Sequence, residues 1–548
     1  MKIKRPISVI LTILLFVLLF NGCSSSNTIK GTDTSSNPAT DEAISQIKLP
    51  IVDKPLTLSL WAPISDKVTN AYKSYGDLPL FKEMETRTGI HINFLHPPVG
   101  QETDQLNLML ASNDLPDILQ YDWGTIAGGP AKILGEKQII KLNDYVDKYA
   151  PNMKKLMLDD KELKKQMILD DGTFYSFPYL TRIPTEGAWY GPQMRKDWLD
   201  KLQLKAPTTI DEWHDVLVAF RDKDPNGNGK NDEIPFVGKG SNGLGILSLQ
   251  DLTPAWGVIN DFTLKDGKVV YGPIESQYKD FLTVMASWYK EKLIDQDLAT
   301  NDSKAFDYKI TNNVAGSYYG SVNGNMGRFL NMMQPVDPKF NLTSLTYPVG
   351  PAGKPYTALD LNMKASPYGS AITSKCKNIK EAIEWLDYGY SVEGGLLFNF
   401  GIEGKSYTMV NGIPTYTDLI WKPTNGDTWD QVMGQYTRAI DIWSMDVSKY
   451  YTEQKLRLPQ QKDASTKNWL QADSARVLPP VTLTDSEART KASIMNQVET
   501  YRNETMGKIV MGKLPVSDFD KYVQTIKSMG IDQVTQIEND AYQRYLKR

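Results

Sequence analysis

The sequence is poor in the residues that build disulfide frameworks, metal centres and nucleic-acid interfaces. It has two cysteines and three histidines in 548 residues, and 61 lysines and arginines stand against 65 aspartates and glutamates, a net charge of −4. Two cysteines exclude a disulfide-rich scaffold. A slightly acidic chain lacks the basic surface that phosphate contacts require, so we expect no nucleic-acid partner. Three histidines leave little scope for histidine-based metal or acid–base chemistry.

The motifs of several enzyme classes are also missing. The chain contains no G-x-S-x-G, H-E-x-x-H or C-x-x-C pattern. The glycine-rich segment 314–328 lacks the spacing of a dinucleotide-binding or P-loop motif. We therefore predict a protein that is not an enzyme. A pair of catalytic carboxylates, as in glycoside hydrolases, stays open as an alternative because any two acidic residues can converge in a fold.

Residues 1–22 have the pattern of a secretory signal. A basic start is followed by an apolar run from Ile7 to Phe20, which is shorter than the roughly 20 residues of a spanning helix. The run ends at Asn21-Gly22-Cys23 and a serine-rich tract, which resembles a bacterial lipoprotein cleavage box, although Phe20 stands where leucine is usual. We predict lipidation of Cys23 and attachment to the extracellular face of the cell membrane. An uncleaved anchor is the alternative.

The segment after the signal differs from the rest of the chain. Residues 23–49 are rich in Ser, Thr, Asn and Asp and have no periodic apolar face, so we expect a flexible tether. With Cys23 lipidated, Cys376 is the single free thiol, and no disulfide forms within one chain. A lone cysteine without a nearby histidine is typical of a small packing residue rather than of a reactive thiol.

Alternating strand and helix patterns follow the tether. Leu56, Leu58 and Leu60 alternate with polar residues, which predicts a strand ending at Trp61. The pattern continues with a helix over 80–88, a strand over 91–94, a helix over 104–112 and a strand over 117–121. This order predicts an α/β fold with a parallel sheet and crossover helices. Ligands bind at the carboxyl ends of such strands, where Trp61, Asp122 and Trp123 stand.

Several segments together resemble a known family. The strand to Trp61, FKEMETRTGIHINF, NDLPDILQYDW and QIIKLNDYV resemble the first lobe of extracellular solute-binding proteins of ABC importers, in the maltose-binding-like family 1. Segments 195–213, 372–394, 400–417 and 516–534 resemble a subgroup of large Gram-positive lipoproteins of that family. The resemblance implies a two-lobed, periplasmic-binding-protein-like fold with a hinge and a ligand cleft between the lobes.

The resemblance also implies a division of the chain and a function. The expected first lobe comprises residues 50–180 and 340–395, and the expected second lobe comprises 181–339 and 396–548. The implied function is a monomeric, lipid-anchored receptor that binds an oligosaccharide by hinge closure and delivers it to ABC permease subunits. A membrane-tethered carbohydrate-active enzyme and a polysaccharide-binding adhesin are the alternatives.

One local motif indicates a metal. Oxygen-bearing side chains stand at positions 1, 3, 5 and 9 of a loop that has Gly229 at position 6, like the first part of a calcium loop. Pro235 replaces the usual glutamate at position 12, and a nearby glutamate takes that role in related loops of the subgroup. A polar turn without an ion is the alternative. The predicted ligands of a structural calcium are Asp224, Asn226, Asn228, Lys230 (by its carbonyl), Asp232 and Glu233.

The aromatic residues are the second signal, with 12 tryptophans and 28 tyrosines. Pyranose faces pack on aromatic rings, and sugar hydroxyls bind carboxylates and guanidinium groups. The predicted ligand contacts are Trp61, Asp122, Trp123, Trp189, Tyr190, Trp256, Tyr318, Tyr319, Arg328 and Asp360. For each ring the alternative is buried packing. Arg182, Arg195 and Arg328 are the candidate donors for an acidic sugar. By contrast, Trp198, Trp213, Trp288 and Trp385 lie on amphipathic helices, and we expect them in the core.

Overall fold

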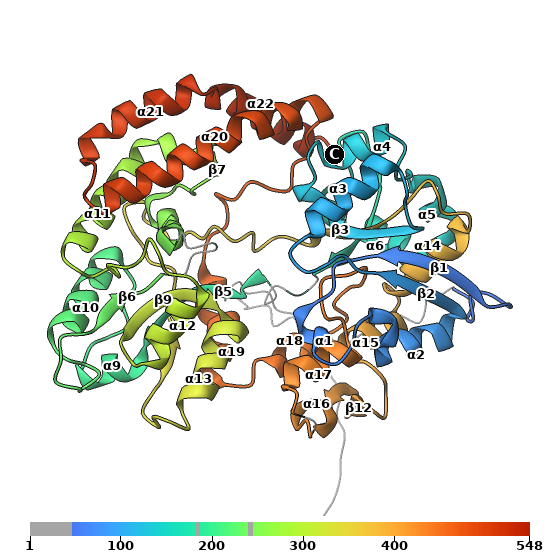
Figure 1. Ribbon diagram of the computed structural model, residues 1–548, viewed down its shortest axis with the longest axis horizontal. Helices are drawn as coiled ribbons and strands as arrows, with labels where there is room; N and C mark the ends of the chain where they lie inside the picture. Colours follow the sequence, from blue (N-terminus) through green and yellow to red (C-terminus); the bar gives the residue numbers. More distant parts are fainter. Residues whose placement is uncertain (1–46, 182, 184–186, 239–244, 425) are drawn as a thin grey trace, which may run out of the picture. The chain divides into compact units, whose positions relative to one another are not determined.

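The computed structural model describes residues 47–181, 183, 187–238, 245–424 and 426–548. The predicted signal 1–22, Cys23 and most of the predicted tether 23–49 lie outside the described residues. From residue 47 onward the described chain belongs to one compact unit, in which two larger β-sheets each carry a hydrophobic core (Figure 1). None of the helices described is long and apolar enough to cross a membrane.

The first sheet confirms the predicted α/β pattern. Its strand order is β2-β1-β3-β11-β4. The strands are β1 Leu56–Trp61, β2 Ile90–Leu95, β3 Ile118–Asp122, β4 Phe177–Leu180 and β11 Ala365–Ile372. Strand β1 runs parallel to β2 and to β3, whereas β11 runs antiparallel to β3 and to β4. We call the part of the molecule around this sheet the first lobe.

Short helices cover the first sheet, and their ends follow local sequence signals. They are α1 Asp66–Thr69, η1 Tyr75–Asp77, α2 Pro79–Thr88, α3 Glu102–Ser112, η2 Trp123–Thr125, α4 Gly129–Gly135, α5 Asn143–Tyr149, α6 Pro151–Asp159, α7 Lys161–Met167, α14 Ile379–Tyr388 and α15 Val392–Phe400. Helix α2 illustrates the signals: Pro79 occupies its first turn, and Gly89 ends it at φ +76°, a left-handed conformation that glycine adopts readily.

The second lobe is built around the sheet β10-β5-β9-β6. Its strands are β5 Tyr190–Arg195, β6 Ile234–Phe236, β9 Ala315–Ser321 and β10 Leu342–Ser344, and the separate hairpin is β7 Phe262–Lys265 with β8 Lys268–Tyr271. Its helices are α9 Lys196–Lys201, α10 Ile210–Asp222, η4 Gly245–Trp256, η5 Gly272–Ile274, α11 Ser276–Lys290, α12 Ser303–Thr311, η6 Val322–Gly327, α13 Arg328–Met333, α19 Pro459–Asp463, η7 Ala464–Asn468, η8 Trp469–Gln471, α20 Asp485–Val510, η9 Val516–Asp518, α21 Phe519–Ser528 and α22 Ile531–Leu546. The long α20 lies against α11 and α22 (Figure 1).

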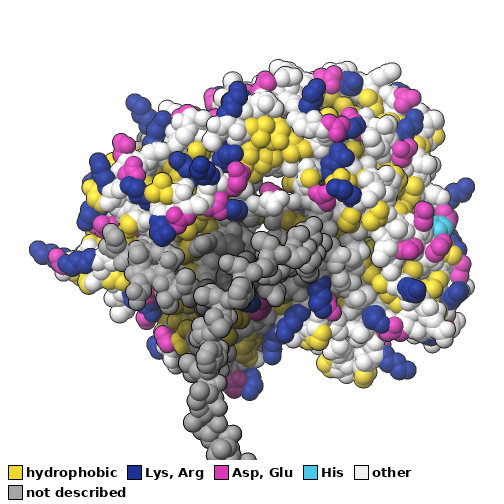
Figure 2. Space-filling view, turned by 180° about the vertical axis from the view of Figure 1, so that it is seen from behind, with side chains coloured by type: hydrophobic (Ala, Val, Ile, Leu, Met, Phe, Trp, Pro, Cys, Tyr) yellow, Lys and Arg dark blue, Asp and Glu magenta, His cyan; other side chains and the backbone are white. Residues whose placement is uncertain are grey.

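The helical tryptophans confirm the expected cores. Trp198, Trp213 and Trp288 are buried in the core of the second lobe, and Trp385 is buried in the core of the first. Cys376 is likewise buried in the first core, where burial raises the pKa of its thiol to about 12, so it is a packing residue. Lys, Arg, Asp and Glu side chains are interspersed over the face shown in Figure 2.

A small module follows the first lobe in the sequence. It consists of β12 Tyr407–Val410, β13 Ile413–Tyr416, α16 Asp418–Trp421, α17 Trp429–Tyr436 and α18 Tyr450–Lys455. The module has its own aromatic cluster around Phe400. Helix α17 contacts α1 and α2, and Tyr436 packs against both this cluster and the first core. The module therefore belongs to the first lobe.

The lobe boundaries differ from two of the sequence expectations. Strand β10 pairs antiparallel with β5, with Leu342 opposite Arg195, so the chain returns to the first lobe only after β10 and not at residue 340. Segment 396–447 also stays with the first lobe, because Phe398 and Trp443 are buried in its core. The last passage into the second lobe ends at Leu456, which is buried in the second core. Strand β10 has only three residues, which are too few to predict which sheet the strand joins.

Candidate functional site

Among the described residues, three cavities lie between the hydrophobic cores of the two lobes. The apolar cavity has a volume of about 620 Å³, the charged cavity about 330 Å³, and the aromatic cavity about 170 Å³. The apolar and charged cavities share Met363 and Ser366, and the charged and aromatic cavities share Trp189. The shared residues make the three cavities neighbours, with walls from both lobes, and we call the three together the cleft.

The aromatic cavity is built on the second sheet. Trp189 directly precedes β5, and Tyr190 begins it, while β9 supplies Tyr319, opposite Pro192. The ring centroids of Trp189 and Tyr190 lie 5.4 Å apart, and those of Tyr190 and Tyr319 lie 6.3 Å apart. Trp189 is 50 % exposed, the only one of these rings that offers much of its surface to solvent. An exposed indole at the junction of two cavities is suited to packing a flat ligand face.

A carboxyl group is enclosed beside these rings. Helix η4 places Asp251 so that the Tyr190 hydroxyl donates a hydrogen bond to its Oδ2 over 2.7 Å. Burial raises the pKa of Asp251 to about 7. Tyr347 lies on the other side of Tyr190 and donates its hydroxyl to the Tyr190 carbonyl over 2.7 Å. Asp251 lines the aromatic cavity, and it is therefore a candidate acceptor for a ligand hydroxyl.

The charged cavity lies on the first-lobe side of Trp189. Arg438 is 9 % exposed and donates from Nη2 to the Tyr179 hydroxyl over 2.6 Å and to Asp446 Oδ1 over 3.1 Å. Its guanidinium also lies 3.7 Å from the centroid of the Tyr179 ring. Lys67 lines the same cavity, with Nζ 3.4 Å from Asp430 Oδ1. The cavity thus contains cations that are already engaged by a carboxylate or an aromatic ring.

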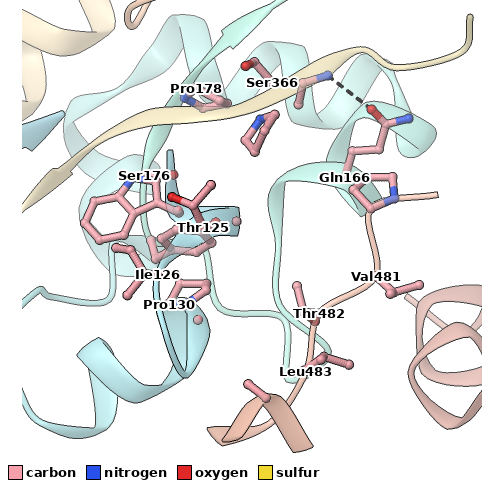
Figure 3. Close-up of a pocket in the computed structure, with 18 of the residues that line it drawn as sticks. Thr125, Ile126, Pro130, Gln166, Ser176, Pro178, Ser366, Val481, Thr482 and Leu483 are labelled. Carbon is pink, nitrogen blue, oxygen red and sulfur yellow. Dashed lines mark hydrogen bonds between the residues drawn. The ribbon is translucent and has the colours of Figure 1, made fainter. Parts of the chain in front are cut away.

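The apolar cavity lies where the first lobe meets the segment before α20. Figure 3 shows Thr125, Ile126 and Pro130, which follow β3, across from Val481 and Leu483, which precede α20. The expectation that β3 ends at a ligand cavity therefore agrees with the position of this cavity.

The structure brings some of the predicted contacts to the cleft. Trp189, Tyr190 and Tyr319 line the aromatic cavity, and Asp360 lines the apolar cavity. Asp122 is half-buried at the end of β3, where its Oδ1 accepts a hydrogen bond from Gly124 N over 3.0 Å. Burial raises the pKa of Asp122 and the pKa of Asp360.

Four of the predicted rings are packed and do not present a face to the cleft. Trp61 is 6 % exposed against Tyr121. Trp256 lies edge-on to Phe281. The other two are Tyr318 and Trp123.

Tyr318 and Trp123 are buried for local reasons. Tyr318 points to the side of β9 that is opposite to Tyr319, into the core, because successive strand residues alternate in direction. Trp123 forms part of the wall of the apolar cavity, but its ring is fully buried, and Nε1 donates to the Gly369 carbonyl over 2.8 Å.

The arginines proposed for an acidic sugar are also engaged. Arg328 makes two 2.7 Å hydrogen bonds to the carboxylate of Asp307. Arg195 is 1 % exposed and pairs with Asp197. Arg182 lies outside the described residues. The basic side chains that line the cleft instead, among them Arg438 and Lys67, had no signal in the sequence, because each depends on how distant segments pack.

The predicted metal ligands form a compact loop between α10 and β6. Asp224 Oδ1 accepts hydrogen bonds from Gly227 N over 2.9 Å and Asn228 N over 3.0 Å. The Nδ2 groups of Asn226 and Asn228 both donate to Asp232 Oδ1 over 3.0 Å. The side chains at loop positions 3, 5 and 9 therefore contact one another, and the carboxylate at position 1 accepts from the loop backbone. Gly229 has a φ of +74°, as the sharp turn requires.

Glu233 tests whether this loop fits a cation. Both of its carboxyl oxygens are buried, and neither has a hydrogen-bond partner in the described structure. Burial raises its pKa, and the charges of Asp224 and Asp232 raise it further. A buried, unpaired carboxylate beside two others is costly without a cation. Among the described residues, no group of three or more His, Cys, Asp or Glu is placed to hold a metal by itself, so amide and carbonyl oxygens would complete the ligand set.

Comparisons with known proteins agree on one family. The model of a family described as bacterial extracellular solute-binding protein matches residues 66–395. The chain is 26 % identical to the fructooligosaccharide ABC transporter substrate-binding protein FusA of Streptococcus pneumoniae serotype 4, covering 98 % of this chain and 97 % of the relative. It is also 26 % identical to lipoprotein LipO of Bacillus subtilis strain 168, covering 89 % and 92 %.

Solved structures give the same fold. The alginate-binding protein AlgQ2 without calcium ion is 26 % identical, with a TM-score of 0.71 over 90 % of this chain and 99 % of that one. An EF-hand mutant of Streptococcus pneumoniae FusA in complex with fructo-nystose is 23 % identical, with a TM-score of 0.72 over the same shares. The two-lobed architecture expected from the sequence is thereby confirmed.

Proposed function

Because the chain belongs to the bacterial extracellular solute-binding protein family, we propose that it is the receptor of an ABC importer and that its ligand is an oligosaccharide. The relatives named above support an importer component rather than an enzyme. The cleft binds the sugar, and ABC permease subunits encoded elsewhere receive it. The receptor itself acts as a monomer.

The half-exposed Trp189 is the observation that carries the proposal. Its ring stands at the junction of the aromatic and charged cavities. A sugar packed on this ring places hydroxyl groups within reach of Asp251 on one side and of the polar groups around Arg438 on the other. Aromatic stacking combined with carboxylate and guanidinium partners is the chemistry that suits a saccharide.

Closure of the two lobes completes the binding site. Trp189 is the last residue of the passage from β4 to β5, and Asp360 and Met363 lie in the passage from β10 to β11. These connections are the hinge. The sugar binds one lobe first, and rotation about the hinge brings the other wall against it, so that ligand shifts an open–closed equilibrium toward the closed form.

Calorimetry and solution scattering test the proposal together. Purified mature protein is titrated with fructo-, malto-, manno-, galacto- and uronic-acid oligosaccharides, and each mixture is then measured by small-angle X-ray scattering. We expect one class of oligosaccharide to bind, to be recovered unchanged, and to reduce the radius of gyration. Release of shorter sugars, abolished by removing two cleft carboxylates, would show a tethered carbohydrate-active enzyme instead. Binding without any closure would favour an adhesin.

The loop of Asp224 to Glu233 is proposed as a structural calcium site. Its ligands would be the side chains of Asp224, Asn226, Asn228, Asp232 and Glu233 and the carbonyl of Lys230. The unpaired Glu233 carboxylate supports a cation there, and structures of relatives described as an EF-hand mutant and as lacking calcium support the choice of calcium. The ion would neutralise the carboxylates and hold α10 against β6.

Membrane attachment through Cys23 completes the proposal. The similarity to LipO supports a lipoprotein, and the serine-rich tract after Cys23 suits a tether on the extracellular face of the cell membrane of a Gram-positive bacterium. We expect the Cys23→Ser variant to be released into the medium, whereas the wild-type protein sediments with membranes and incorporates radiolabelled palmitate. Equal partitioning of the two proteins would contradict lipidation.

A further inference from the structure

The apolar cavity differs in chemistry from the remainder of the cleft. Ile126 and Pro130 line one side and Val481 and Leu483 the other (Figure 3). Met363 adds a thioether side chain that is 39 % exposed, and it lines the charged cavity as well. These walls offer an apolar surface that water contacts when the cleft has no ligand.

The polar side chains in these walls are occupied by the protein itself. Gln166 Oε1 accepts hydrogen bonds from the backbone N–H groups of Lys364 and Ala365, and its Nε2 donates to a backbone carbonyl. Thr125 donates its hydroxyl to the Asp122 carbonyl over 2.8 Å. The Thr482 hydroxyl accepts a hydrogen bond from Arg548. Each of these side chains is therefore held by at least one hydrogen bond within the protein.

Charged groups in the walls also have partners within the protein. Lys491 Nζ lies 2.7 Å from Glu538 Oε1, and the Glu538 side chain is only 1 % exposed. Asp360 Oδ1 accepts the Asn362 N–H over 2.9 Å. A pyranose placed here would exchange its hydrogen bonds with water for contacts with apolar side chains, which is unfavourable for its hydroxyl groups. An apolar group would gain from the same contacts.

The position of the apolar cavity indicates which ligand would carry such an apolar group. The apolar cavity adjoins the charged cavity at Met363 and Ser366, which line both, and the charged cavity adjoins the aromatic cavity at Trp189. We propose that the apolar cavity is a subsite for an apolar substituent, aryl or acyl, on the saccharide that the Trp189 side of the cleft binds. This inference rests on the proposed function. The volume of about 620 Å³ exceeds the space that a single ring or short acyl chain needs, so the subsite accepts such groups without rearrangement.

Matched glycosides test the subsite. Each oligosaccharide of the calorimetry panel that has a reducing end is prepared as its methyl glycoside and as its 4-nitrophenyl glycoside. We expect the 4-nitrophenyl glycoside to bind about tenfold tighter than the methyl glycoside, because its ring is removed from water in the apolar cavity. The heat capacity change on binding should also be more negative for the aryl glycoside.

A cavity-filling variant assigns the preference to this cavity. Ala492 lines the apolar cavity from α20, and Ser493 is an exposed neighbour on the same helix that does not line it. In Ala492→Phe, the ratio of the aryl-glycoside affinity to the methyl-glycoside affinity should fall to about one, and Ser493→Phe should keep the wild-type ratio. Equal affinities for both glycosides in the wild type, or a preference that survives in Ala492→Phe, would refute the subsite alone. If no methyl glycoside binds at all, the proposed function fails and the subsite fails with it.

Discussion

The metal loop and the cleft differ in how their residues are distributed along the chain. The loop takes its predicted ligands from ten consecutive positions, 224–233, between one helix and one strand. The aromatic cavity alone joins Trp189, Asp251, Tyr319 and Tyr347. A contiguous site is fixed by local turns, whereas the cleft exists only after strands have paired and lobes have packed. Changes in the loop should therefore alter the stability of the protein, and changes in the cleft should alter its affinity for the sugar. Each effect should be independent of the other.

The largest effect is expected from removing the exposed ring of the cleft. Trp189→Ala should weaken oligosaccharide binding by about 100-fold, because the sugar loses its stacking surface and the apolar area buried with it. Since Trp189 is half-exposed and lies far from the metal loop in the sequence, the melting temperature and the calcium response should stay at wild-type values. Calorimetry and differential scanning calorimetry measure both.

A matched control is available for this ring. Tyr308 on α12 is 65 % exposed and lines none of the three cavities. Tyr308→Ala should bind the sugar as the wild type does. If both variants lose affinity equally, or if Trp189→Ala binds normally, Trp189 is not the stacking surface.

Removal of calcium should give the next largest effect, and it should appear in stability. An ion present at a hundredfold excess over its dissociation constant stabilises the folded state by about 2.7 kcal/mol. Chelation should accordingly lower the melting temperature by several degrees, on the order of 2–4 °C per kcal/mol. Sugar affinity below the transition should change little, because the loop residues line none of the three cavities.

Substitutions separate a bound ion from a general salt effect. Asp232→Asn removes a predicted ligand, whereas Asp211→Asn changes an exposed aspartate on the neighbouring α10. The melting temperature of Asp232→Asn should no longer respond to chelator, and that of Asp211→Asn should respond as in the wild type. A wild-type protein that contains no calcium by mass spectrometry and ignores the chelator would contradict the site.

Local sequence signals predicted the elements that depend on their own residues. Alternating leucines predicted β1, and the residue pattern over 80–88 predicted α2. The sequence did not reveal that β10 pairs with β5, because three residues carry no register information. It also did not reveal that segment 396–447 stays with the first lobe, since Phe398 and Trp443 are hydrophobic in a way that suits either core.

The same limit applies to the candidate site. Tyr318 and Tyr319 are adjacent and chemically alike, yet only Tyr319 lines the cleft, because neighbouring strand residues point to opposite faces. Asp251 was missed altogether, since its partner Tyr190 is 61 positions away in the sequence. Trp189 could be recognised as a candidate because it lies outside any helical pattern, but its exposure depends on the fold.

The buried carboxyl of the cleft predicts a pH dependence of stability. Burial raises the pKa of Asp251 from its ordinary 3.8 to about 7. Between those values the folded protein holds a proton that the unfolded chain has released, so a rise in pH lowers the stability of the folded state. From pH 5 to pH 7 the wild type should lose about 1 kcal/mol per pH unit relative to Asp251→Asn.

Denaturant titrations of the two proteins at several pH values measure this difference. Every other titrating group is common to both proteins and cancels in the comparison. The exposed control Asp211→Asn should follow the wild type. A constant difference in stability between Asp251→Asn and the wild type across this range would show that the Asp251 carboxyl is ionised throughout. The Glu233 carboxylate would be ionised in the same way when it binds calcium.

The smallest effect concerns charges that join the lobes beside the apolar cavity. Asp170, which follows α7 in the first lobe, accepts hydrogen bonds from Arg544 Nε over 2.6 Å and Arg548 Nε over 2.9 Å at the end of α22. Arg544 also binds Glu487 of α20. These charge pairs join the two lobes in this structure, and we expect them to be kept in the closed form. Asp170→Asn should then raise the population of the open form and lower the apparent sugar affinity about two- to fivefold.

Salt concentration distinguishes this effect from a change in the sugar site. The pairs of Asp170 with Arg544 and Arg548 are largely buried, so salt screens them only in part. The affinities of the wild type and Asp170→Asn should therefore lie closer together in 0.5 M sodium chloride, where the Debye length is about 4 Å, than at 0.01 M, where it is about 30 Å. Asp520→Asn removes an exposed pair with Lys279 inside the second lobe and should show neither effect. A deficit in Asp170→Asn that is no smaller at high salt would place the cause in lost packing at the cleft rather than in charge. Trp189→Ala, whose lost contact is apolar, should by contrast bind weakly at both salt concentrations.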